Sequence, residues 1–204
     1  MSTFSDAGLR LKADFIGGKG WVIPFQLAPG NVRDLLEDIQ LDQPQDIDNM
    51  FVAFYEDWVL LPRVFNSLKS DAHFAKYNTL MSQVAACYDL GHYAIVVAGA
   101  VSVIEGLLVD LTNDKSQSMG GKLKAIETAA NTDFDILTAP VLISLNAFLK
   151  PLYAHKSFQS VQPVDLNRHW INHGRAELKD SRTDALKVIN AVNSLGYAVK
   201  FLVP

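Results

Sequence analysis

Residues 92–111 have the sequence HYAIVVAGAVSVIEGLLVDL, which is apolar on almost every side of a helix. A helix of this kind lies at the centre of a helical bundle or crosses a membrane. Residues 93–109 are about as long as the shortest membrane spans. However, Ser102 and Glu105 interrupt the segment, and Asp110 closes it without a Lys or Arg anchor. Because a carboxylate inside a membrane is unfavourable, we predict a buried core helix and no membrane partner.

The segments on both sides of this core helix repeat apolar residues at three- and four-residue steps, which is the period of amphipathic helices. The pattern covers residues 46–90, 122–150 and 180–201, and no strand-rich block or internal repeat interrupts it. The last of these helices could pack along the core helix through one apolar face: Ala185, Leu186, Ile189, Val192, Leu195 and Val199. The sequence therefore predicts an all-α fold, a helical bundle formed by residues 46–204.

Residues 1–45 lack this regular period and are predicted to form an irregular N-terminal arm. Glycine and proline, which interrupt helices and strands, are frequent in this region. One short helix is expected within it, with Asn31 as its N-terminal cap and an apolar stripe that follows: Val32, Leu35, Leu36 and Ile39.

Composition limits the functions that are open to this chain. Its 204 residues suffice for one domain, and 18 basic against 22 acidic side chains give a net charge of −4. No overall positive field attracts nucleic acid, so any RNA or phosphate site must be local. The single cysteine, Cys87, cannot form an intrachain disulfide, and residues 1–15 contain no continuous apolar segment. Both features favour the reducing cytoplasm.

The densest group of chemically versatile side chains is the segment DLNRHWINHGR at residues 165–175. A short helix capped by Asp165 or Asn167 would turn Trp170 into the core. We then expect Arg168, His169, Asn172 and His173 near one another on the exposed side. His169 and His173 stand four residues apart, a metal-binding spacing, but no Glu follows His169 and no cysteine lies nearby. No metal site and no cofactor is predicted.

This segment resembles the signature of the HEPN superfamily (higher eukaryotes and prokaryotes nucleotide-binding). That signature is an arginine, a polar residue directly after it and a histidine a few positions later, which Arg168, His169 and His173 match in the four-spacer form. In related uncharacterised bacterial proteins, an earlier helix has a tyrosine near its start and an Ile-Glu-Gly-Leu-Leu run, similar to Tyr93 and residues 104–108 here. The resemblance covers residues 75–202.

The resemblance implies an all-helical domain that dimerises, and many members are metal-independent endoribonucleases of toxin and phage-defence systems, some with an antitoxin partner. It implies that Arg168 and His173 are catalytic, while Glu105, Asn167, His169 and Asn172 support them. A net acidic chain and the N-terminal arm depart from the minimal family domain. Two functions therefore stay open: an endoribonuclease, and a non-catalytic module that binds nucleotide or RNA or only dimerises.

RNA cleavage by attack of a ribose 2′-hydroxyl needs a base, an acid and a cation for the phosphoryl oxygens. His173 can transfer protons near neutral pH, and Arg168 can present its planar fork to the phosphate. Since each chain supplies one matching histidine, a homodimer would supply both base and acid. Glu105 lies in an apolar helix and needs a donor, for which Arg168 is our candidate; exposure to solvent at the helix edge is the alternative.

Overall fold

The computed structural model describes residues 6–42, 46–57, 60–70, 72–112, 118–131 and 138–202, and over these residues the chain is helical without any strand. The predicted all-α helical bundle is therefore confirmed. In chain order the elements are α1 (Asp6–Gly18), α2 (Pro29–Asp38), α3 (Ile47–Asp57), α4 (Leu60–Ser70), the 3₁₀ helix η1 (Ala72–Tyr77), α5 (Asn78–Asp89), α6 (Tyr93–Thr112), α7 (Met119–Asn131), α8 (Thr138–Tyr153), α9 (Arg168–Asn172) and α10 (Arg182–Leu202).

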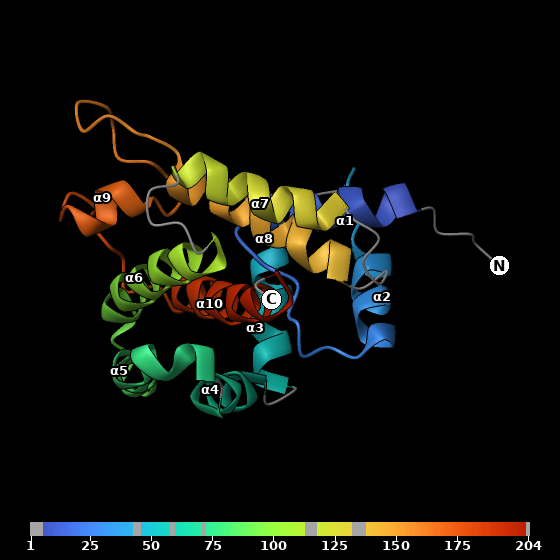
Figure 1. Cartoon of the computed structure of the whole chain (residues 1–204), viewed down its shortest axis with the longest axis horizontal. Helices are drawn as coiled ribbons and strands as arrows, with labels where there is room; N and C mark the ends of the chain where they lie inside the picture. Colours follow the sequence, from blue (N-terminus) through green and yellow to red (C-terminus); the bar gives the residue numbers. More distant parts are fainter. Residues whose placement is uncertain are drawn as a thin grey trace.

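Helices α6 and α10 form the centre of the bundle and lie side by side, as Figure 1 shows. The side chains of Val101 and Ile104 from α6 and of Ile189 and Val192 from α10 are fully buried. By length and composition alone α6 could cross a membrane, with a mean hydropathy of 2.1 over Tyr93–Leu111, and half of that window is buried inside the bundle. The predicted packing of the last helix along α6 is confirmed.

Two further layers cover this central pair. Helices α4 and α5 lie on one side of it, and α1, α7 and α8 lie on the other (Figure 1). The contact between α1 and α8 is very close, since a Cβ atom added at Gly17 would lie 2.4 Å from the carbonyl oxygen of Ser144. Glycine is required here because no side chain fits between the two helices.

Within residues 6–42, the described part of the predicted irregular arm, the chain forms two helices and packs on the core, so it is not irregular there. Residues 6–18 form α1, whose Ala13 and Ile16 are fully buried, and the following Trp21–Ile23 segment is buried as well. The glycines near residue 18, which suggested an arm, instead terminate α1. The short predicted helix exists as α2, but Ala28 is its cap and Pro29 opens it, because the fixed φ of proline suits the first helical position.

Helix α9 lies at one end of the bundle, next to α6 and α8 (Figure 1). After Tyr153 the chain leaves α8 in an irregular loop, residues 154–167, and enters α9 directly. The loop and α9 together carry the segment that the sequence singles out.

Candidate functional site

Asn167 fixes the start of α9. Its Oδ1 accepts the backbone N–H of Trp170 at 3.3 Å, which confirms Asn167 as the cap. Its Nδ2 donates to the carbonyl oxygens of Pro151 at 3.2 Å and Ala154 at 2.8 Å. Asn167 is only 3% exposed, so its contribution to the site is to tie α9 to the end of α8.

The end of α9 is equally well defined. Gly174 has φ +64°, a left-handed conformation that glycine adopts readily. The backbone N–H of Arg175 donates to the carbonyl oxygen of Trp170 at 2.8 Å, which turns the chain back over the helix. The side chains of Trp170 and Ile171 are buried, as expected for Trp170. This one-turn helix therefore holds its remaining side chains on a rigid base.

One face of α9 binds Glu105 of α6. Nη1 of Arg168 donates to Oε1 of Glu105 at 3.1 Å, and Nδ2 of Asn172 donates to Oε2 at the same distance. The predicted pairing of Glu105 with Arg168 is confirmed. The side chains of Arg168 and Glu105 remain 27% and 35% exposed, so the pair is half-buried. We name Glu105, Arg168 and Asn172 the carboxylate cluster.

Tyr153, the last residue of α8, extends this cluster. Its ring centroid lies 5.3 Å from the guanidinium carbon of Arg168, a cation–π contact. Burial raises the pKa of Tyr153 well above its usual range, and the Glu105 carboxylate adds to the increase while Arg168 opposes it. Tyr153 therefore stays neutral. One tyrosine ring and one carboxylate thus hold the Arg168 side chain in place.

A different face of α9 carries two histidines packed around Phe158 of the loop. The rings of His169 and His173 are 4.7 Å apart between centroids in a T-shaped contact. Phe158 stacks on His169 at 4.3 Å and meets His173 edge-on at 5.6 Å. The guanidinium carbon of Arg175 lies 5.4 Å from the Phe158 ring centroid. We name Phe158, His169, His173 and Arg175 the imidazole cluster.

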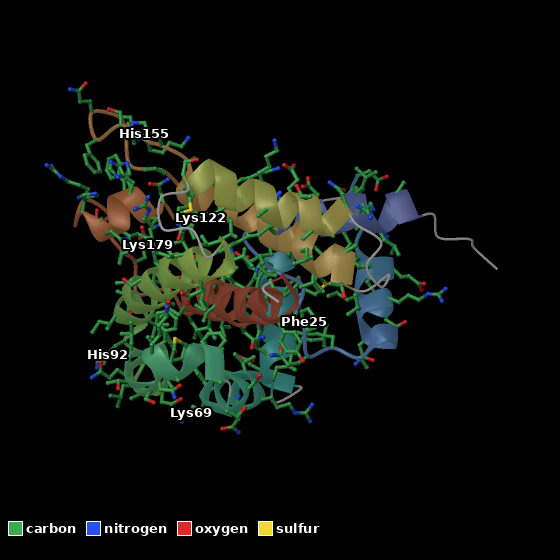
Figure 2. All side chains as sticks on the ribbon, in the orientation of Figure 1. Phe25, Lys69, His92, Lys122, His155 and Lys179 are labelled. Atoms are coloured by element: carbon green, nitrogen blue, oxygen red, sulfur yellow. The ribbon has the colours of Figure 1, made fainter. Side chains whose placement is uncertain are left out.

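The imidazole cluster lies at the surface beside His155, which Figure 2 labels in the loop next to α9. The rings of His155 and His169 are 5.6 Å apart. Desolvation lowers the pKa of His169, and the neighbouring His173, His155 and Arg168 lower it further. The cause is physical: a positive charge on His169 would lose hydration and face other cationic groups. His169 therefore favours the neutral form.

The four motif side chains, which the sequence predicts on one exposed side, lie on two different faces of α9 in the structure. Consecutive residues of a helix are rotated by about 100°, so residues four apart share a face. Arg168 pairs with Asn172 on the face toward Glu105, and His169 pairs with His173 on the face toward Phe158. Phe158 was not among the predicted site residues, and Arg175 had no predicted role. Arg175 belonged to the dense segment, but nothing in the sequence places Phe158 beside it.

A pocket of about 120 Å³ lies on another side of the loop, between residues 162–167 and 176–179. Its charged lining includes Asp165, Glu177 and Asp184, against one lysine, Lys179. This acidic excess does not suit a phosphate, and neither Arg168 nor His173 lines the pocket. Among the described residues, no group of three or more His, Cys, Asp or Glu side chains could hold a metal ion.

Comparisons with known proteins found no family model, no curated protein and no solved structure that matches this chain. The function of the chain is therefore inferred from the side chains of α9 and of its neighbours.

Proposed function

We propose that the protein is a HEPN-like, metal-independent endoribonuclease of the cytoplasm, acting as a toxin or phage-defence effector. The observation that carries the proposal is a pair of imidazoles, the half-buried His169 and the exposed His173, whose ring centroids are 4.7 Å apart, with the charge of Arg168 near enough to lower the pKa of His169. Two groups that exchange protons near neutral pH, next to a cation, are what phosphodiester cleavage needs.

In the proposed reaction His173 transfers a proton as acid or base, the role that the resemblance gives it. The same resemblance implies that Arg168 binds the phosphate and stabilises its charge. The carboxylate cluster attaches α9 to the core helix, since Glu105 of α6 accepts hydrogen bonds from Arg168 and Asn172. Preorganised groups on a rigid element lower the barrier because little motion is needed during the reaction.

The proposal includes a homodimer and, for a toxin, an antitoxin protein that covers the site. The chemical reason for a dimer is weaker than the sequence suggests, because His169 supplies a second imidazole within one chain. A second copy is instead supported by Leu90, which is 70% exposed at the end of α5, and Ile95, which is 58% exposed in the first turn of α6. Clustered exposed apolar side chains mark protein interfaces.

Cleavage of total RNA in the presence of EDTA tests the enzyme directly. We expect the wild type to cleave and His173→Ala to lose about 100-fold or more of the rate, as for the loss of a proton-transfer group. His92→Ala is the matched control, since His92 is exposed at the start of α6 and does not contact α9. Equal rates for wild type and His173→Ala would contradict the proposed role of His173.

A second function is favoured by the carboxylate cluster itself. Because Glu105 already accepts hydrogen bonds from Arg168 and Asn172, these residues would keep α9 folded in a module that binds RNA or nucleotide, or only dimerises, without cleaving. RNA bound with unchanged length, by wild type and His173→Ala alike, would favour this alternative.

A further inference from the structure

A second cavity, of about 200 Å³, lies where the end of α1 meets the end of α8 and the start of α10. Its apolar wall includes Phe148 and Leu152 of α8, which are almost completely buried, and Leu166 of the loop before α9. The loop is fixed beside α8, since the Nδ2 of Asn167 donates to the carbonyl oxygen of Pro151 at 3.2 Å. The cavity is therefore preformed by the core and by a loop that is tied to it.

Four charged side chains line this cavity, two of each sign: Lys19, Lys187, Asp165 and Asp184. Both aspartates also line the acidic pocket of about 120 Å³ between the loop and residues 176–179, and neither lysine does. The carboxylates therefore lie where the two pockets adjoin, and the lysines lie toward the other end of the larger cavity.

These opposite charges do not neutralise one another. Lys187 pairs at 2.8 Å with Asp48 of α3, which does not line the cavity. Among the residues that the structure describes, Lys19, Asp165 and Asp184 form no ion pair. The cavity thus separates an ammonium group from two carboxylates, beside an apolar wall.

We propose that this cavity binds a zwitterionic α-amino acid with an aliphatic side chain of about the size of leucine. The carboxylate of the ligand would accept hydrogen bonds from Lys19, and its ammonium group would donate to Asp165 and Asp184. The apolar wall would remove the aliphatic side chain from water. Neither Arg168 nor His173 lines the cavity, so this site is separate from the proposed RNA site.

The size and the charge of the cavity both favour this class of ligand. An apolar cavity of about 150 Å³ holds one benzene molecule, so a cavity of about 200 Å³ admits a slightly larger molecule. Drug-sized ligands occupy roughly 300–1,000 Å³ and are too large. A phosphate ion is less suitable, because the two carboxylates would repel it.

The test begins with calorimetric titration of the full chain with L-leucine, and with inorganic phosphate as the comparison ligand. We expect leucine to bind at least tenfold more tightly than phosphate. In NMR spectra leucine should shift the methyl signals of Leu152 and Leu166. The methyl signals of Leu68, which is buried in α4 on the opposite side of the bundle, should not move.

Variants test each charged end of the cavity. Lys19→Gln and the double variant Asp165→Asn/Asp184→Asn should each weaken leucine binding by about tenfold or more, the effect of losing a hydrogen bond to a charged group. The control is Lys69→Gln, an exposed lysine of α4 that Figure 2 labels, and it should bind leucine as the wild type does. Circular dichroism melts establish that each variant is folded.

Two analogues of leucine show which end of the cavity binds which group. Leucinamide lacks the carboxylate, 4-methylpentanoate lacks the ammonium group, and the wild type should bind each about tenfold more weakly than leucine. Lys19→Gln should bind leucine and leucinamide equally, because the partner of the carboxylate is already absent. The double aspartate variant should likewise bind leucine and 4-methylpentanoate equally.

A wild type that gives no heat and no methyl shifts with leucine at millimolar concentration would overturn the proposal. Equal affinities of the wild type for leucine and both analogues would also overturn it, since they would indicate an apolar cavity without recognition of charge. Phosphate binding that Lys19→Gln abolishes, without leucine binding, would instead assign the lysine end to an anion site. None of these outcomes depends on whether the protein cleaves RNA.

Discussion

His169 is the residue whose surroundings lead to the clearest prediction. Its pKa is lowered from an ordinary value of 6.5, mainly by desolvation and then by the cationic groups around it. A base with a lowered pKa is half-protonated at a pH below 6.5. If His169 is the base, the acid limb of the cleavage rate therefore lies below pH 6.5.

A pH–rate profile of the wild type measures this limb. His169→Ala should abolish the acid limb along with most of the rate. His155→Ala should move the limb to higher pH, because His155 lowers the pKa of His169 and that effect is removed. An acid limb centred above pH 6.5 would be inconsistent with His169 as the base.

At the scale of the element, the position of His173 depends on how α9 ends. Gly174 has φ +64°, and a residue with a Cβ atom is strained there by about 1 kcal/mol. Gly174→Ala should therefore lower the free energy of unfolding by roughly that amount and reduce cleavage by disturbing the end of α9, where His173 lies. Gly30→Ala in α2 is the control: its φ is not left-handed and a Cβ atom there meets nothing within 4 Å.

Chemical denaturation and the RNA assay together check this pair. For Gly30→Ala we expect a small gain in stability, on the order of 0.5 kcal/mol, because alanine restricts the unfolded chain, with unchanged cleavage. If Gly174→Ala were as stable and active as the wild type, the turn would not be what places His173.

Sequence patterns predict the elements best where burial follows a regular period. The core helix is apolar nearly all round and α10 has a continuous stripe, so both were predictable, as was the cap of α9 by Asn167. The fold of residues 6–23 was not predictable in this way. In the sequence Gly17 indicates the end of a helix, and only the structure shows that a glycine is needed there because α8 packs so closely against α1. The site was half predictable. The pairing of Glu105 follows from its place in an apolar helix, where a carboxylate needs a donor, whereas the position of Phe158 depends on the path of an irregular loop.

For the whole molecule, the prediction concerns association. Leu90 and Ile95 are exposed apolar side chains close in the chain, and their burial between two copies would supply part of the free energy of a dimer. Light scattering at micromolar concentration should report a dimer for the wild type and a monomer for Leu90→Glu/Ile95→Glu. Leu11→Glu in α1, also an exposed leucine, should leave the dimer intact. A monomeric wild type over this range would exclude the proposed assembly.

The buried Trp21–Ile23 segment also has a consequence for synthesis. The backbone N–H of Ile23 donates to the hydroxyl of Ser144, 121 residues later, and Asn190 donates its side-chain amide to the carbonyl of Val22, 168 residues later. These residues are translated more than a hundred residues before the helices that cover them. The nascent chain must therefore carry an exposed tryptophan and its apolar neighbours until α8 and α10 emerge, an interval in which chaperones can bind them.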